Sequence, residues 1–345
     1  MAPDHTPLDQ LAAEYWEGRM QADPIEATLL GDRRYDDRMP DQSPEGHQRD
    51  IRRLEELLAR VNALPPPSGR DRVTWGSLRG EIESDLALRR CHLHEWSVDP
   101  RDGPQVLFLN LANLQPVTTL AQGRALVARW QKMGPDLDGR IANLRRGLAA
   151  GKVATRGSVE RVLRQLDDLL AAPTAEWVLM APARAAHSDW SDADRGALYN
   201  GVAQAIDQGI RPAFLRYRDI VRAEILPRSR PDDAVGLAHV PDGAACYDSL
   251  IKVHTSLPLP AEEIHRIGLE EVASVRAEMM ALGQKLFGTG ELKAVQQKLR
   301  SDPALYFRTR EEVEAKAEQA LRRAEAVMPK WFGHLPRTPC VVKRV

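Results

Sequence analysis

Apolar residues recur every three or four positions along most of the chain, the spacing of one face of an α-helix. Two such stripes follow each other early in the sequence: Ile51, Leu54, Leu58 and Val61, then Trp75, Leu78, Ile82 and Leu86. Three consecutive prolines at positions 65–67 separate them and end the first helix, because proline lacks the backbone N–H that would continue it. We therefore expect an antiparallel pair of helices here.

Helix starts are marked by side-chain acceptors placed directly before proline or a helical stripe. Thr6-Pro7, Asp23-Pro24 and Ser43-Pro44 each place a capping residue before a proline at the first helical position. Further along, Ser191 precedes Asp194 by three residues, and Thr309 and Glu312 have the spacing of a capping box. Each of these signals predicts the beginning of a helix.

The middle of the chain continues the helical pattern with a few interruptions. Residues 99–119 contain several prolines and a glycine around a short apolar run, and we expect a loop there. Separate helices are predicted around residues 126–133, 137–148 and 159–170, with Gly151 as a C-cap. A longer stripe passes through Pro212 and resumes at Phe214, which favours a kink over a break.

The C-terminal third predicts more helix and then a change of structure. Residues 235–243 indicate a turn, with a short strand left open, and Pro260 opens a helix. A last helix after Thr309 is expected to stop at Pro329, and residues 340–345 predict the start of a β-strand. Because such a strand has no partner after it, we expect the domain to be cut at this point.

These patterns together predict a mainly α fold, a multi-helix array with short strands only. We expect an N-terminal helical region at 1–234 and its helical continuation at 235–345, which form one domain overall. Among 345 residues, 43% are hydrophobic and 28% charged, values typical of soluble globular proteins. The net charge of -1 and the lack of a long apolar stretch argue against nucleic acid and membrane as partners.

The three cysteines are Cys91, Cys246 and Cys340, an odd number at wide spacing. This arrangement argues against a disulfide framework and against a zinc–thiolate site, and it suits a reducing compartment. The N-terminus has no basic segment followed by an apolar one, as a signal peptide would have. We therefore predict a cytoplasmic protein.

Known catalytic motifs are missing from the sequence. There is no H-E-x-x-H zinc motif, no nucleophile elbow, no phosphate-binding loop and no dinucleotide fingerprint. His94-Glu95 begins like a zinc motif, but Val98 stands where the second histidine would be. If His92 and His94 lay on a helix they would point about 200° apart, so we expect a polar helix end and no metal site.

The clearest junction between a turn and a helix lies after Tyr247, where His254 and Thr255 precede the helix that Pro260 opens. Such junctions often carry functional groups, because loops present polar side chains while helices hold them in place. The plainer interpretation is that Tyr247 is a core aromatic and that His254 caps a carbonyl. His265 follows on the next helix, where a surface histidine is the ordinary expectation.

Several phrases of the sequence, in order, resemble the bacterial domain-of-unknown-function family 885. The phrases are Leu29–Asp37 with Pro40-Asp41, Gly147–Gly151 with Gln165-Leu166, Val240–Gly243 through Tyr247 and His254-Thr255, Glu262–Leu269, Ser301–Pro303 with Tyr306-Phe307, and Phe332–Pro336. They cover nearly the whole chain, and no single phrase is diagnostic. One departure is Leu259, where the family usually has a capping threonine.

The resemblance implies a larger helical protein similar to zinc-dependent peptidases of the gluzincin type. Their metal-binding His-Glu-Ala-x-Pro-Gly-His-His phrase would follow the strand that begins near Val341, and no position here matches it. Catalytic and metal residues therefore cannot be carried over, and no cofactor is expected in this chain. The resemblance carries over only a cleft wall of Tyr247, His254 and Thr255, with His265 on the helix that follows.

Three hypotheses follow from the sequence. The first is an N-terminal scaffold of a zinc-peptidase-like protein, inactive by itself, whose partners are a peptide substrate and the missing C-terminal part. The second is a non-enzymatic helical binding module derived from that scaffold. The third is an enzyme whose metal site is completed by a second polypeptide or by residues dismissed above.

Overall fold

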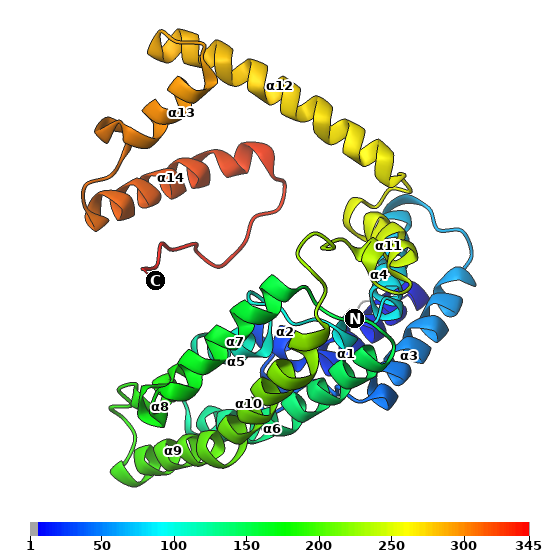
Figure 1. Ribbon diagram of the computed structural model, residues 1–345, viewed down its shortest axis with the longest axis vertical. Helices are drawn as coiled ribbons and strands as arrows, with labels where there is room; N and C mark the ends of the chain where they lie inside the picture. The colour runs from blue at the N-terminus through cyan, green and yellow to red at the C-terminus, as the bar shows by residue number, and fades with distance from the viewer. Residues whose placement is uncertain (1–5, 345) are drawn as a thin grey trace. The chain divides into compact units, whose positions relative to one another are not determined.

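The computed structural model describes residues 6–344, apart from the side chain of Arg70, and confirms a mainly α-helical array (Figure 1). Within these residues, β pairing is limited to one isolated parallel bridge between Thr155 and Arg230. The chain forms two compact units, Met1–Pro260 and Ala261–Val345. The division falls after residue 260, whereas the sequence suggested a change of region after residue 234. None of the described helices has the length and apolar character needed to cross a lipid bilayer.

The first unit contains most of the helices. Their bounds are α1 (Pro7–Ala22), α2 (Pro24–Leu29), α3 (Pro44–Asn62), α4 (Gly69–Arg90), α5 (Pro104–Leu114), α6 (Leu120–Ala149), α7 (Arg156–Ala171), α8 (Ala181–Arg184), α9 (Asp192–Ala205), α10 (Arg211–Ile220) and α11 (Gly243–Thr255). The predicted starts at Thr6, Asp23 and Ser43 are confirmed, because each side chain accepts a backbone N–H from the first turn of its helix.

Helices α3 and α4 form the antiparallel pair that the two early stripes predict. The indole of Trp75, near the start of α4, donates to the carbonyl of Val61 at the end of α3 at 3.0 Å. At the other end of the pair, Arg89 forms an ion pair with Asp50 at 3.0 Å. Apolar residues of α1, α3 and α4 together form a core of their own.

Helix α6 is the centre of the larger core, which also takes residues from α5, α7, α9 and α10. The prediction of two helices here is wrong, because α6 continues without interruption through Pro135. Trp130, Met133 and Leu137, on both sides of the proline, are completely buried in that core. Packing of this continuous face outweighs the roughly 3 kcal/mol that an interior proline costs a helix.

The expected loop at residues 99–119 contains the helix α5, which the sequence analysis missed. Pro104 stands in its first turn, and its residues Phe108 and Leu111 are completely buried. Helices buried on several sides show no clear polar face, so periodicity alone does not separate them from a short apolar run. Further along, α9 and α10 are joined by the π-helical turn η5 (Ile206–Ile210), through which the helix reaches Pro212 without a break.

A buried arginine fastens the N-terminal segment to α6. The guanidinium of Arg129 donates to the carbonyls of Pro24, Tyr35 and Arg38 and to the amide oxygen of Gln115, at 2.6–3.1 Å. The early phrase Leu29–Asp37 that carries part of the family resemblance thus has a structural role, because Tyr35 within it supplies one of the carbonyls that satisfy a buried charge.

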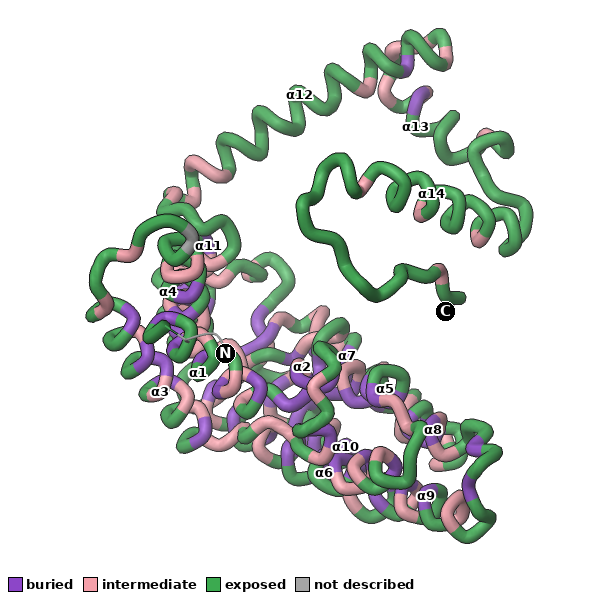
Figure 2. Tube along the Cα trace, turned by 180° about the vertical axis from the view of Figure 1, so that it is seen from behind, coloured by how far each residue is buried: buried purple, intermediate pink, exposed green. Residues whose placement is uncertain are grey.

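The second unit consists of α12 (Ala261–Phe287), α13 (Leu292–Ser301) and α14 (Arg310–Trp331). Thr309 caps α14 as predicted by accepting the N–H of Glu312, but the helix continues two residues beyond Pro329. Among the described residues of this unit, only Gly283 and Val295 are buried (Figure 2). The predicted strand is wrong for residues 340–344, which have no regular secondary structure.

Candidate functional site

A cleft lies between α4 and α11 in the first unit. It consists of two adjoining cavities of about 400 Å³ and 680 Å³, which share Glu83, Ala87 and Ser249 in their linings. The smaller cavity is also lined by Cys91, His92, Trp96, Lys152, Asp242 and Cys246. The larger one is lined by Gly76, Gly80, Ser84, Lys252 and Ser256. We refer to the two cavities together as the α4–α11 cleft.

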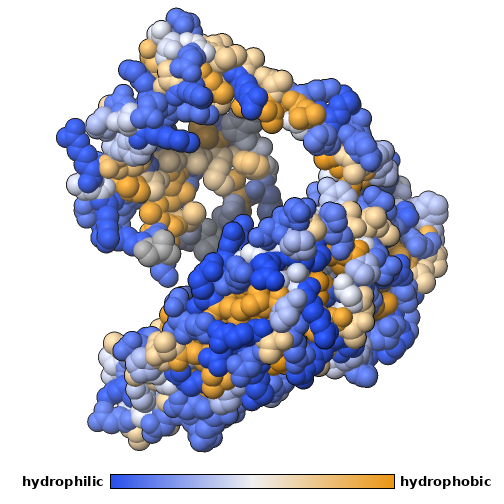
Figure 3. All heavy atoms as spheres, in the orientation of Figure 1, coloured by the Kyte–Doolittle hydropathy of each residue, from blue (hydrophilic) through white to orange (hydrophobic). Residues whose placement is uncertain are grey.

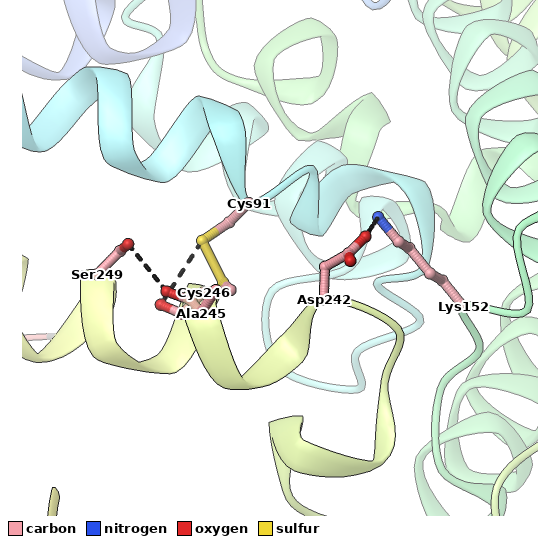
Figure 4. Close-up of a disulfide and its surroundings, with 6 residues drawn as sticks. All are labelled: Cys91, Lys152, Asp242, Ala245, Cys246 and Ser249. Atoms are coloured by element: carbon pink, nitrogen blue, oxygen red, sulfur yellow. Dashed lines mark hydrogen bonds and ion pairs between the residues drawn. A yellow bond between two sulfur atoms is a disulfide. The ribbon is translucent and has the colours of Figure 1, made fainter.

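A disulfide between Cys91 and Cys246, which both line the smaller cavity, joins the end of α4 to α11 (Figure 4). The sequence analysis argued against such a bond, and that prediction is wrong. The two residues are 155 positions apart in the chain, but the packing of α11 on α4 brings their Cα atoms to 5.3 Å. Stable disulfides are typical of oxidising compartments, so the bond weighs against the cytoplasmic location, which stays a prediction.

Charged side chains of opposite sign face each other across the cleft. Lys252 of α11 lies 3.2 Å from Glu83 of α4. Lys152 lies 3.8 Å from Asp242, whose carboxylate points toward it from the start of α11 (Figure 4). The hydroxyl of Ser249 donates to the carbonyl of Ala245, one turn earlier in α11. The cleft therefore offers both charges and hydrogen-bonding groups, as a polar ligand such as a peptide requires.

Unusual backbone conformations gather at the same place. Among the described residues, the non-glycine residues with positive φ are His92 (49°), Asp242 (61°) and Ser256 (58°), and all three line the cleft. Left-handed conformations of this kind cost free energy and are concentrated at functional sites. The Pro-Asp-Gly phrase has a steric reason at the same place. A Cβ at Gly243 would lie 1.7 Å from the carbonyl oxygen of Leu237, so only glycine fits there.

The site residues proposed from the sequence are only partly brought together. Tyr247 and His254 are exposed and seven positions apart on α11, so they share one face of that helix. Thr255 has a local role, since its hydroxyl donates to the carbonyl of Ile251 at 2.7 Å. None of the three is among the residues that line the cleft. His265 lies exposed on α12, in the other unit.

A histidine cluster at the end of α4 was missed because its local structure was predicted wrongly. The helix ends at Arg90, His92 adopts the left-handed conformation, and Leu93–Glu95 form the 3₁₀ turn η2. The rings of His92 and His94 therefore approach each other, with centroids 5.8 Å apart, and do not point to opposite faces of a helix. His47 of α3 stacks on His94 with a centroid distance of 3.8 Å.

Burial favours the neutral forms of His47 and His94 by lowering their pKa values. Desolvation, followed by the nearby His47 and His92, lowers the pKa of His94 to about 3. Desolvation and the neighbouring Arg89 also lower the pKa of His47. The Nε2 atom of His47 is buried without a hydrogen-bond partner. Sequence spacing gave no signal for this cluster, because it depends on one left-handed residue and on packing against α3.

Comparison with known proteins identifies the family of the chain and one similar fold. No curated protein matches the sequence. The crystal structure of a "putative lipoprotein" from Colwellia psychrerythraea superposes with a TM-score of 0.78 at 17% identity, over 96% of this chain and 61% of that one. The chain thus spans less than two thirds of that neighbour. The sequence matches the family described as "Bacterial protein of unknown function (DUF885)" over residues 24–345, and the chain therefore belongs to this family.

Proposed function

We propose that this chain is the helical, non-catalytic part of a zinc-peptidase-like protein and that it hydrolyses no peptide by itself. The observation that carries the proposal is the uncovered apolar face of α12. Its residues recur at alternating spacings of three and four: Val272, Val275, Met279, Leu282 and Leu286. This is the spacing with which one helix packs against another, yet all but Met279 are exposed. Figure 3 shows hydrophobic residues at the surface along this helix.

The occupant that we propose for this face is the remaining part of a longer protein. A chain that spans 61% of a solved neighbour leaves a substantial part of that neighbour without a counterpart here. By the family resemblance, such a part would contribute the His-Glu phrase. A zinc ion held there would polarise the scissile carbonyl, with a glutamate to activate water. Contiguous exposed apolar surfaces are typical of interfaces.

The α4–α11 cleft would then bind the substrate. An extended peptide presents backbone N–H and C=O groups, which Glu83, Lys252 and Ser249 could pair with. Tyr247, His254 and Thr255 as a cleft wall stay a prediction, and so does His265. The position of Tyr247, His254 and Thr255 on α11 suits residues that contact the outer part of a bound peptide.

The reading frame beyond the codon of Val345 and the activity of its product test this proposal. We expect an in-frame His-Glu phrase there and chelator-sensitive hydrolysis of short quenched-fluorescence peptides by the longer protein. The 345-residue chain alone should show no hydrolysis, even with added zinc. Zinc-dependent turnover by the chain alone would overturn the claim of inactivity, and a longer protein without turnover would overturn the peptidase assignment.

The α4–α11 cleft favours one alternative, a helical binding module without catalysis. The cleft is built entirely from the first unit and is complete in this chain. Tight binding of unmodified short peptides by the chain, combined with an inactive longer protein, would support the binding module. A Lys252→Ala variant should weaken such binding, because it removes the ammonium group that would donate to carbonyl groups of the peptide.

A further inference from the structure

The cluster at the end of α4 brings together three side chains with metal-binding chemistry. The ligand atoms of His92, His94 and Glu95 all lie within 4.8 Å of one another, and all three side chains are partly buried. Within the described residues, no other group of three or more histidine, cysteine, aspartate or glutamate ligands has this arrangement. Two imidazoles and one carboxylate form a ligand set that suits zinc and related divalent transition metals.

The fold holds this cluster in place from several sides. The left-handed His92 turns the chain directly after Cys91, which the disulfide fixes to α11. Helix α6 packs closely against this turn. A Cβ at Gly147 of α6 would lie only 2.0 Å from the carbonyl oxygen of Glu95. On the other side, the ring of His47 lies parallel to that of His94, with an angle of 15° between them. Such support reduces the reorganisation that a ligand site needs.

The present partners of Glu95 leave its carboxylate available. Its carboxylate lies 3.8 Å from Nδ1 of His92 and 3.8 Å from the guanidinium of Arg146, both beyond hydrogen-bonding distance. An ordinary ion pair of this length in a partly exposed position contributes little to stability. Arg146 donates in addition to the amide oxygen of Asn143, so it keeps a partner when Glu95 turns away.

We propose that His92, His94 and Glu95 bind a divalent transition-metal ion, with zinc as its representative. Ligand atoms at 2.0–2.2 Å from a tetrahedral ion lie about 3.4 Å apart, so the three side chains would close by roughly 1 Å on binding. Rotation of the partly exposed His92 ring supplies part of this movement. Because His92 also lines the smaller cavity of the α4–α11 cleft, the proposed site borders that cavity.

This site is independent of the metal segment that the family resemblance implies, because it uses residues of this chain only. Calcium and magnesium are poor candidates, since they prefer oxygen ligands to imidazoles. Cys91 does not take part as a thiolate ligand, because it is oxidised to the disulfide. The ion would fix the end of α4 relative to η2 and the cleft without any role in hydrolysis.

Zinc titration of the chelator-treated 345-residue chain tests the proposal. We expect one equivalent to bind with a Kd in the micromolar range or tighter and to raise the Tm. His92→Asn and Glu95→Gln should each weaken binding at least tenfold and abolish the rise in Tm. Asparagine is chosen at position 92 because it tolerates the left-handed conformation. His334→Gln, an exposed histidine of the second unit, is the matched control and should bind like the unchanged chain.

Folding of the variants is checked separately in the presence of chelator, where all should have the circular dichroism and Tm of the unchanged chain. X-ray absorption at the zinc edge should show two imidazoles and one carboxylate. Absence of zinc binding to the unchanged chain overturns the proposal. Equal binding by the His92→Asn and Glu95→Gln variants also overturns it, because the ion would then be held elsewhere. Either result leaves the peptide-hydrolysis assays of the proposed function unaffected.

Discussion

The two units of this chain contain helices with similar local signals but very different burial. In the first unit, the stripes of α3 and α4 pack with α1 in one core. Those of α6 and α7 belong to the largest core, which contains completely buried residues such as Trp130 and Phe214. In the second unit, α12 has a comparable stripe, but its leucines and valines are exposed. Helix α14 has no buried residue in the structure.

This difference separates two sources of helix stability. Caps and residue propensities act within a helix and contribute about 1 kcal/mol or less each. Packing of an apolar face contributes more, and it depends on a partner that can lie far away in the sequence. The first unit has both sources, whereas the second depends on local signals until its apolar face is covered. Measurements that separate the two units can therefore test our account.

The largest expected effect concerns the disulfide, which lies only in the first unit. We expect Cys91→Ser combined with Cys246→Ser to lower the free energy of unfolding of this unit by roughly 3–5 kcal/mol, because the bond closes a loop of 155 residues. Urea unfolding followed by tryptophan fluorescence measures this loss, since six of the seven tryptophans precede residue 261.

The matched control for the disulfide is Cys340→Ser, which removes an exposed free cysteine in the second unit. This variant should unfold at the same urea concentration as the unchanged chain. Dithiothreitol should reproduce the effect of the double variant and leave the control unchanged. If reduction does not alter the transition, the bond is not formed in solution and the argument for an oxidising compartment fails.

A second comparison replaces one leucine in each unit. Leu126 of α6 is completely buried, whereas Leu282 of α12 is 46% exposed. We expect Leu126→Ala to destabilise its unit by about 2–5 kcal/mol through loss of burial and a cavity. Leu282→Ala should cost less than about 1 kcal/mol, because little buried surface is lost and alanine is a good helix former.

Chemical unfolding of both variants at two protein concentrations measures this contrast. A loss of several kcal/mol for Leu282→Ala would contradict the open face of α12 in the isolated chain. If that loss also grew with protein concentration, a second copy would cover the face, in place of the remaining part of a longer protein.

Much of the fold could be predicted from the sequence, since caps and stripes act over a few residues. Thr6, Asp23 and Ser43 begin helices as predicted, and the α3–α4 pair follows from its two stripes. Errors arose where a distant partner decides the outcome. Packing in the core around α6 keeps that helix continuous at Pro135. Helix α5 is buried on several sides, so its sequence shows no clear helical periodicity.

The candidate site could be predicted far less well. Helix α11 was missed, because the sequence analysis placed a turn before Pro260 where this helix lies. The left-handed Asp242 and the close contact at Gly243 give the Pro-Asp-Gly phrase before it a physical reason. The Cys91–Cys246 bond was not predictable, because spacing in the sequence says nothing about an approach of two helices. The geometry at His92 depends on one residue in the left-handed region, whereas the sequence pattern suggested a continuing helix.

The smallest effect concerns the cap of α14 and tests whether local signals carry the second unit. The hydroxyl of Thr309 accepts the N–H of Glu312 at 3.2 Å, and Thr309→Ala should cost about 1 kcal/mol. Thr309→Ser keeps the hydroxyl and should be close to neutral. Because no residue of α14 is buried, we expect the loss to appear as faster amide hydrogen exchange along the whole helix.

In the first unit, Thr119→Ala removes the equivalent cap of α6, but packing holds that helix and only its first turn should exchange faster. Exchange confined to the first turn in both variants would mean that α14 has a packing partner in solution.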